Sequence, residues 1–264
     1  MKKSYGQHLL TDKNHLNKII KNIGLDSNDV VVEIGAGSGL LTCELSKLVK
    51  KVYAVEIEKE ILKKLEGTIQ LHHLQNVQTV NKNILKLDLP EIAGDSFSVV
   101  GNIPYNITSL ILLKLFGEVD KPALHLKNIN KIYLLVQLEV AERIVAKPNN
   151  KAYSPLSLLI QFFSIPQILF KIPKGAFFPR PRVDSAFVYF ELKKKLPECK
   201  NYILLKNIIR TGFQQRRKKL INSLEKLPAD KVAIRQMFDK LGINHNIRAE
   251  NLSLEDYCML TDNF

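Results

Sequence analysis

The chain has 264 residues, 45% of them hydrophobic, which is enough for one large domain or for a main domain with a small one. No segment has the length of an uninterrupted transmembrane helix, and the first residues lack the apolar stretch and cleavage site of a signal peptide. We therefore expect a monomeric, cytoplasmic protein that is not bound to a membrane.

The charge balance points to a polyanionic partner. There are 39 Lys and Arg residues against 26 Asp and Glu residues, which gives a formal net charge of +13. Such an excess favours nucleic acid or an anionic membrane surface, although a lysine-rich proteome would give the same total. Cys43, Cys199 and Cys258 lie far apart, without metal-ligand spacing, so we expect reduced structural cysteines and no metal.

The first two thirds of the chain alternate between helix-like and strand-like segments. Asp12 can cap a helix whose apolar residues recur at helical spacing, and further helices are expected after the glycine turn to about Lys50 and over 58–70. Two more helix-like runs are "ITSLILLKLF" and "EVAERIVAK". The strand-like runs between them are "VVVEI", "KVYAVEI", "NVQTVN", "SFSVVGN" and "KIYLLVQ". This alternation predicts an α/β fold with a parallel sheet.

The pattern changes in the last third. "SIPQILFKI" and "VDSAFVYFEL" are strand-like runs joined by a Pro-rich loop, and they predict an antiparallel pair at the edge of the sheet. Beyond "KKKLPECK" the sequence is helical throughout, including "RRKKLINSL". We therefore predict a Rossmann-like sheet domain over residues 1–192 and a small all-α domain over residues 193–264.

The segment "EIGAGSG" predicts a turn on which a ligand can lie. Gly35, Gly37 and Gly39 allow a tight strand-to-helix turn with an accessible backbone. At the end of the next strand, Glu56 could accept hydrogen bonds from both ribose hydroxyls of an adenosine. A dinucleotide motif would need a third glycine where Leu40 stands, so NAD is disfavoured. The GxGxG spacing looks like the S-adenosylmethionine (SAM) site of class I methyltransferases, and a plain tight turn is the alternative.

Two further strand ends carry polar groups. Asn83 follows the third strand and could accept a hydrogen bond from the adenine amino group, or it could be only a turn residue. "GNIPYNITS" follows the fourth strand, and ligands of open α/β sheets bind at such strand ends. Asn102 and the backbone carbonyl before Pro104 would be two acceptors, and Tyr105 a ring for stacking. This set suits the exocyclic amino group of a planar base.

Six separated motifs resemble the ribosomal RNA adenine N6,N6-dimethyltransferases, and specifically their small-subunit branch. "NIPY" matches the form that this family gives to the motif of amino-methyltransferases. The other motifs are "YGQHLL", "EIGAGSG" with "AVEIE", "VQLEVAERIVAKP", "AFFPRPRVDSAFV" and "FQQRRKKLINSL". Together they cover nearly the whole chain.

The resemblance implies a role for each matching position. Asn102, Pro104 and Tyr105 would handle the target adenine, and Phe177 would be a second face for the flipped base. The residues that would contact SAM are His8, Leu10, Gly35, Gly37, Glu56, Asn83 and Asn102. The family usually has Asp at position 83 and Asn at position 8.

Several basic residues are candidates for phosphate contacts with ribosomal RNA or a small-subunit precursor. They are Arg180, Arg182, Arg210, Arg216, Arg217, Lys218 and Lys219. A solvated helix face is the alternative for each of them. Two other functions stay open: methylation of large-subunit RNA, as in macrolide resistance, and a nucleic-acid-binding assembly or transcription factor that has lost catalysis.

Overall fold

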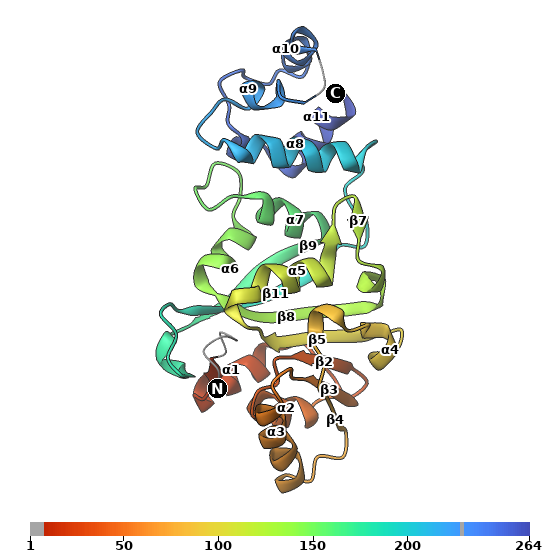
Figure 1. Ribbon diagram of the computed structural model, residues 1–264, viewed down its shortest axis with the longest axis vertical. Coiled ribbons are helices and arrows are strands. Elements are labelled where there is room, and N and C mark those ends of the chain that lie inside the picture. The colour runs from red at the N-terminus through yellow and green to blue at the C-terminus, as the bar shows by residue number, and fades with distance from the viewer. Residues whose placement is uncertain (1–7, 228–229) are drawn as a thin grey trace. The chain divides into compact units, whose positions relative to one another are not determined.

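The computed structural model describes residues 8–227 and 230–264, so Tyr5, Gly6 and Gln7 of the "YGQHLL" motif lie outside the described residues (Figure 1). The chain forms two compact units. The first contains the described residues up to Gly117, with Ala123–Ala141 and Gln167–Leu192, and the second contains Glu118–Pro122, Glu142–Pro166 and Lys193–Phe264. The boundary predicted at residue 192 coincides with the last change of unit. Two earlier segments also belong to the second unit, which the sequence did not predict, and the division into domains 1–192 and 193–264 stays a prediction.

A seven-stranded sheet organises the first unit. Its order is β4 (Val77–Val80), β3 (Lys51–Val55), β2 (Val30–Ile34), β5 (Phe97–Asn102), β8 (Ile129–Gln137), β11 (Ser185–Leu192) and β9 (Ser164–Ile172). The pairs from β4 to β8 are parallel, and β11 is antiparallel to β8. The predicted mostly parallel sheet with an antiparallel edge is confirmed.

Helices connect the strands of this sheet. They are α1 (Lys13–Asn22), α2 (Leu40–Ser46), α3 (Lys59–Leu71), α4 (Leu89–Ala93) and α5 (Thr108–Phe116). Asp12 caps α1 as predicted, because its Oδ1 accepts the His15 N–H at 2.8 Å. The helix α2 is shorter than predicted and ends at Ser46. Single 3-10 turns cover Ile84–Lys86, Tyr105–Ile107, Leu124–Asn128 and Lys174–Ala176.

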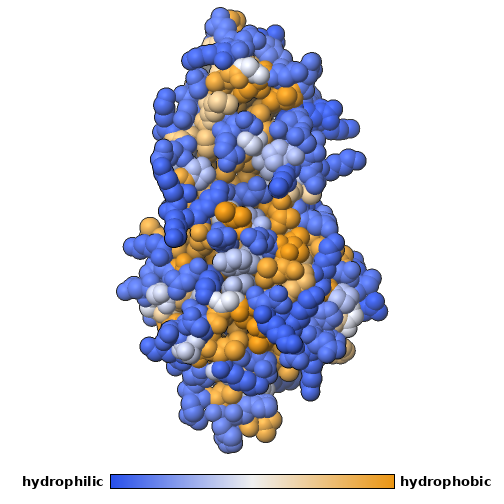
Figure 2. All heavy atoms as spheres, turned by 180° about the vertical axis from the view of Figure 1, so that it is seen from behind, coloured by the Kyte–Doolittle hydropathy of each residue, from blue (hydrophilic) through white to orange (hydrophobic). Residues whose placement is uncertain are grey.

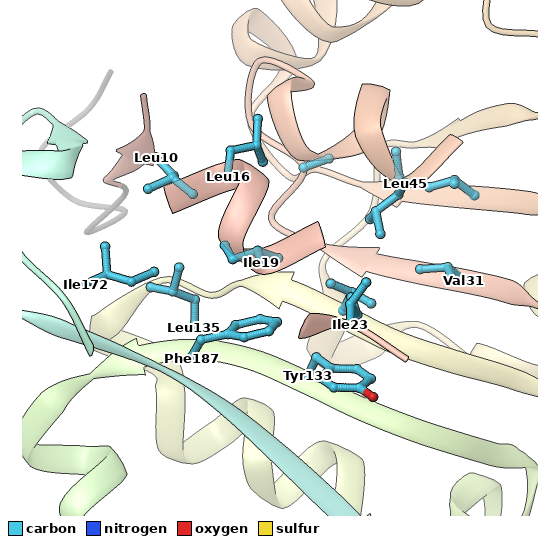
Figure 3. Packing of buried hydrophobic residues seen from close by; sticks show 14 of the residues in the cluster. Leu10, Leu16, Ile19, Ile23, Val31, Leu45, Tyr133, Leu135, Ile172 and Phe187 are labelled. Carbon is cyan, nitrogen blue, oxygen red and sulfur yellow. The ribbon is translucent and has the colours of Figure 1, made fainter. Parts of the chain in front are cut away.

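A hydrophobic cluster fixes α1 against the antiparallel edge of the sheet. Leu16 and Ile19 of α1 belong to the same buried cluster as Leu135 of β8 and Phe187 of β11 (Figure 3). The hydroxyl of Tyr133, in the same cluster, accepts the N–H of Gly24 at 3.1 Å. Burying apolar surface is the main stabilising contribution to folding, and here it also holds the segment before α1 in place.

That segment forms a short strand that the sequence did not predict. The strand β1 (Leu9–Leu10) pairs antiparallel with β10 (Phe177–Phe178), so that Leu9 faces Phe178 and Leu10 faces Phe177. Successive side chains of a strand point to opposite faces. Accordingly, Phe177 is 3% exposed and Phe178 is 69% exposed.

The second unit is mainly helical. It contains the second half of α6 (Leu138–Val145) and all of α7 (Pro155–Phe163), α8 (Tyr202–Gln214), α9 (Leu220–Leu224), α10 (Lys231–Lys240) and α11 (Leu254–Asp262). A 3-10 turn covers Ala249–Asn251, and the short strands β6 (Gly117–Glu118) and β7 (Lys121–Pro122) pair with each other. The basic segment 216–219 precedes α9 instead of forming its first turn, so the helix predicted for "RRKKLINSL" is shorter than expected. None of the described helices combines the length and the apolar character needed to cross a membrane.

Hydrophilic residues cover much of the surface, with hydrophobic groups exposed between them, as Figure 2 shows for one face. The most exposed large apolar side chains among the described residues are Leu124, Leu71 and Phe178, at 89%, 75% and 69%. Single exposed apolar residues are normal on protein surfaces. Such a residue becomes informative only through its neighbours.

Candidate active site

The glycine turn after β2 presents bare backbone to its surroundings. Gly35, Gly37 and Gly39 have φ angles of +76°, +59° and +95°, which side chains of other residues rarely tolerate. A Cβ added to Gly35 would lie 2.8 Å from the carbonyl oxygen of Asn102, and one on Gly37 would lie 2.6 Å from Cδ2 of Leu9. The turn therefore needs glycine for both its conformation and its close approach to β1 and β5.

Glu56 holds this turn from the end of β3. The side chain is buried, its Oε2 accepts the N–H of Gly37 at 3.2 Å, and its Oε1 accepts the N–H of Glu58 at 2.9 Å. Backbone N–H groups thus hold both oxygens of this carboxylate in place. Glu56 and the glycine turn are therefore in direct contact, while their binding of a cofactor stays a prediction.

One pocket lies beside Glu56 at the ends of β3 and β4. Its lining includes Glu56, Ile57, Asn83, Ile84 and Pro104. The Oδ1 atom of Asn83 accepts the N–H of Leu85 at 3.0 Å and so caps a 3-10 turn, which leaves that oxygen one further lone pair. Ile57 was not among the predicted residues, although its place one residue after Glu56 was a signal that could have found it.

A second pocket continues from the first. It is lined by His8, Leu9, Gly35, Gly37, Glu56, Asn102, Ile103 and Pro104. Gly35, Glu56 and Pro104 line both pockets. The two pockets thus bring together almost all residues predicted for the cofactor and for the target amine.

Asn102 is oriented by the N-terminal segment. Its Nδ2 donates to the backbone carbonyl of His8 at 2.7 Å. No described residue donates to its Oδ1, which is the atom that we predicted to accept from an amino group. The contact with His8 therefore uses the donor end of the amide and leaves the acceptor end for a ligand.

Tyr105 is held at both ends. Its hydroxyl is 2.5 Å from Oγ of the buried Ser185, and its ring centroid is 5.3 Å from that of His8. Burial raises the pKa of the Tyr105 hydroxyl, an effect that the hydrogen bond with Ser185 partly opposes. Ser185 lies 80 residues from Tyr105 in the chain, and nothing in the local pattern indicated their contact.

Two predicted residues are buried in the hydrophobic cluster. Phe177 is only 3% exposed, so its ring is not open to a base in this structure, in contrast to our expectation of a second stacking face. Leu10 is also buried in the cluster and lines a neighbouring pocket with Leu16 and Glu33. The side chain that reaches Gly37 is that of Leu9, which the sequence did not single out.

Glu33 lies within β2 and is buried beside this neighbouring pocket. Burial raises the pKa of its carboxyl group to about 8, and the charge of Glu56 contributes in the same direction. The hydroxyl of Thr42, which donates to Oε2 of Glu33 at 2.6 Å, opposes this shift. At neutral pH the protonated form of Glu33 therefore predominates.

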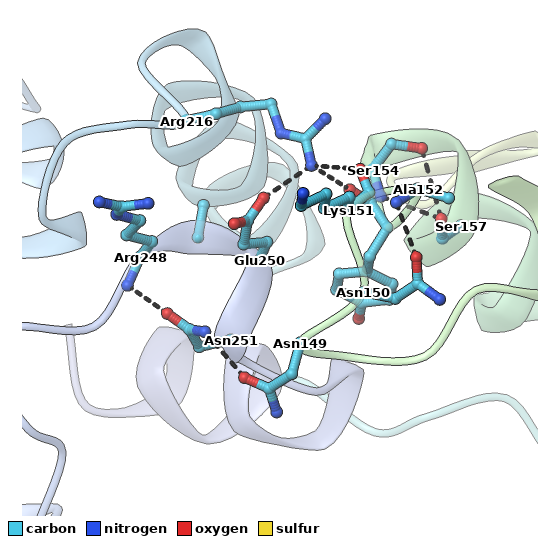
Figure 4. Close-up of polar contacts among 12 residues, drawn as sticks. Asn149, Asn150, Lys151, Ala152, Ser154, Ser157, Arg216, Arg248, Glu250 and Asn251 are labelled. Carbon is cyan, nitrogen blue, oxygen red and sulfur yellow. Dashed lines mark hydrogen bonds and ion pairs between the residues drawn. The ribbon is translucent and has the colours of Figure 1, made fainter.

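The basic residues predicted to contact RNA fall into two groups. Arg180, Arg182, Arg210, Arg217, Lys218 and Lys219 are exposed, and within the described part of the chain none of them forms an ion pair. Arg216 differs, because its Nη2 is 2.7 Å from Oε2 of Glu250 and also donates to the carbonyls of Lys151 and Tyr153 at 2.8 and 3.0 Å (Figure 4). Arg216 therefore has an internal structural role that its basic neighbours lack.

The residues present fit SAM. The cofactor joins an adenosine to a methionine, and the two connected pockets offer a buried carboxylate between an apolar cleft and an open glycine backbone. Glu56 can accept from ribose hydroxyls, while Ile57, Ile84 and Asn83 surround the space available to an adenine. Gly35, Gly37 and Asn102 line the second pocket, which is the space available to the methionine portion.

Comparisons with known proteins show the family of this chain. The family model described as ribosomal RNA adenine dimethylase matches residues 1–264. The chain is 39% identical over 267 residues to the ribosomal RNA small subunit methyltransferase A of Caldanaerobacter subterraneus subsp. tengcongensis, covering 99% of this chain and 96% of that protein. It is 38% identical to the protein of the same name from Lachnoclostridium phytofermentans, covering 98% and 90%.

Solved structures give the same result for the fold. A dimethyladenosine transferase from Plasmodium falciparum is 26% identical, with a TM-score of 0.78 and 96% of both chains covered. The 23S rRNA methyltransferase ErmE, at 23% identity and a TM-score of 0.74 over 97% of this chain and 98% of that one, shares the fold. The chain belongs to the ribosomal RNA adenine dimethylase family, whose members are SAM-dependent methyltransferases.

Proposed function

We propose that this enzyme transfers two methyl groups from SAM to N6 of adenines in small-subunit ribosomal RNA during subunit assembly. The observation that carries the proposal is the uncommitted Oδ1 of Asn102 at the pocket that Glu56 and the glycine turn form. The two curated relatives named above are small-subunit enzymes, which supports this substrate over large-subunit RNA.

The cofactor supplies a methyl group carried on a positively charged sulfur. Glu56 would hold the ribose hydroxyls, since its carboxylate lines the pocket and is fixed by two backbone N–H groups. Asn83 and Ile84 would border the adenine, and His8, Leu10, Gly35 and Gly37 the rest of the cofactor.

Asn102 and the backbone carbonyl before Pro104 would hold the target amino group. The lone pair of an adenine N6 is delocalised into the ring, which makes this nitrogen a poor nucleophile. Accepting both N–H bonds favours a more tetrahedral nitrogen whose lone pair is free to attack. The amide of Asn102 is oriented in advance by His8, so this alignment costs little when the base binds.

Tyr105 would stack on the target base, with its ring position set by Ser185. Phe177 can form the second face only if the residues that cover it shift, because its ring is 3% exposed. A base that has left its helix needs such stacking partners to replace those it has lost.

The exposed arginines and lysines would contact phosphate groups of the RNA, which position a substrate without reading its sequence. In this proposal residues 1–192 carry catalysis and residues 193–264 add RNA contacts. We also propose that the enzyme acts as a monomer in the cytoplasm, where its substrate is assembled. Light scattering of the purified protein would measure its molar mass and so test the monomeric state.

The decisive experiment uses labelled SAM with small and large ribosomal subunits that lack the modification, followed by mapping of the labelled nucleotides. We expect two methyl groups per target adenine in the small subunit alone. Label in large-subunit RNA would favour the macrolide-resistance type of activity. No label in either subunit, with SAM still bound, would favour a non-catalytic assembly factor.

A further inference from the structure

Phe178 is an exposed aromatic residue with no structural reason to be so. Its neighbour Phe177 is 3% exposed and packs in the hydrophobic cluster, whereas Phe178 is 69% exposed on the opposite face of β10. A large apolar side chain in water does not contribute to folding through burial. An exposed ring at a fixed place in a strand is therefore a candidate for contact with a ligand.

The charges around Phe178 indicate the kind of ligand. Arg180 and Arg182 follow it in the same loop, and both are exposed. The single carboxylate of the segment 171–185, Asp184, accepts the backbone N–H of Lys174 at 2.9 Å and forms no ion pair with a described residue. Aromatic rings interleaved with unpaired arginines suit single-stranded nucleic acid, because bases stack on the rings while the cations meet phosphates.

The position of Phe178 connects it to the active site. Phe178 faces Leu9 in the β1–β10 pair, and Leu9 lines the pocket that contains Asn102 and Glu56. The next residue, Pro179, offers its carbonyl oxygen to Nδ1 of His8 at 2.6 Å, and the ring of His8 lies beside that of Tyr105. In Figure 1 the cyan-green loop that carries Phe178 lies beside α1, and it leads into β11 at Ser185, which pairs with Gln137 at the carboxyl end of β8. A strand of RNA whose base is at Tyr105 would thus pass this loop within a few nucleotides.

We infer that Phe178 is a stacking platform for an unpaired nucleotide next to the target adenine. This inference rests on the proposed function, since it assigns a second nucleotide subsite to the same RNA substrate. Arg180 and Arg182 fix the phosphates on either side of that nucleotide. The subsite accepts any base, because every base has a face on which a ring can stack.

The test compares three variants of the full-length enzyme, with small subunits that lack the modification as substrate. Phe178→Ala should raise KM for the subunits about tenfold, with kcat and SAM affinity within about twofold of the unsubstituted enzyme. Phe178→Tyr should restore KM, and Phe178→Leu, which is apolar but has no aromatic face, should not. Leu71→Ala, at a residue 75% exposed on α3, is the matched control and should leave KM, kcat and SAM affinity unchanged.

A binding measurement identifies the occupant. Phe178→Ala should also weaken binding to a protein-free small-subunit RNA transcript by about tenfold in fluorescence anisotropy. An unchanged KM, or full rescue by Phe178→Leu, overturns the inference. A defect with subunits that is absent with the transcript also overturns it, because the occupant would then be a ribosomal protein. If the unsubstituted enzyme methylates no ribosomal RNA, the proposed function itself has failed.

Discussion

Asn102 and Arg216 were both predicted to hold substrate, but they differ in how far internal hydrogen bonds occupy the groups that would bind it. The donor end of the Asn102 amide is bound to His8, and its acceptor oxygen has no partner among the described residues. The Nη2 of Arg216, in contrast, donates to a carboxylate and two carbonyls inside the second unit. The internal contact of Asn102 therefore orients its acceptor oxygen for a ligand. The internal contacts of Arg216 instead occupy its Nη2 donor group.

Removing the acceptor oxygen of Asn102 should have the largest effect on methyl transfer. Asn102→Ala should lower kcat for methyl transfer to unmodified small subunits by about 100-fold or more, since preorganised polar groups at a reacting centre contribute on that order. SAM titration of the same variant shows how much of the loss is due to cofactor binding. Methyl transfer at the rate of the unsubstituted enzyme would mean that Asn102 does not hold the amine.

Substitution of Glu56 tests its assignment to the ribose hydroxyls of the cofactor. Glu56→Ala should weaken SAM binding by about 10- to 100-fold, because hydrogen bonds to a charged group are worth about 1.5–3 kcal/mol. Isothermal titration measures the affinity, and Glu60→Ala, at an exposed position of α3, is the control. An affinity equal to that of the control would contradict the ribose assignment.

The carboxyl group of Glu33 should make stability depend on pH. Its folded-state pKa of about 8 lies above the ordinary glutamate value of 4.5, so between these values the folded protein binds a proton that the unfolded chain releases. The free energy of unfolding therefore falls as pH rises through this window, and we expect a loss of about 2 kcal/mol relative to Glu33→Gln. Urea unfolding of both proteins at several pH values measures the difference, and parallel pH profiles would be evidence against the burial of a titrating Glu33.

Ser185 and Tyr105 should act as a pair. Ser185→Ala should lower kcat only a few-fold, since a neutral hydrogen bond contributes about 0.5–1.5 kcal/mol. Tyr105→Phe keeps the ring and removes the same bond, so the double variant should lose no more than either single one. Fully additive losses in a double-mutant cycle would show that the two side chains act separately.

The residues found and missed by sequence share a physical explanation. Glu56, Asn83 and Asn102 follow parallel strands, so a single inference, that of the sheet, places all three at one edge. The contact of Tyr105 with Ser185 depends on the pairing of strands far apart in the chain. The burial of Phe177 and the exposure of Phe178 depend on the register of a two-residue strand, and a shift by one residue would reverse them.

Substitutions of Arg216 and Arg217 should have the smallest effects, and they test whether internal contacts decide which basic side chains are available to RNA. Arg216→Ala should lower the free energy of unfolding by about 1 kcal/mol, because it removes a partly exposed ion pair and leaves two carbonyls without this donor. Arg217→Ala should leave stability unchanged and weaken binding to small-subunit RNA, with a smaller dependence of affinity on salt. Denaturant unfolding and RNA titrations at several salt concentrations separate the two effects. Equal losses of RNA affinity with no loss of stability in either variant would mean that the internal contacts of Arg216 do not limit its availability to RNA. Stability lost at Arg216 and RNA affinity lost at Arg217 would show that adjacent arginines of one basic run serve the fold and the substrate separately.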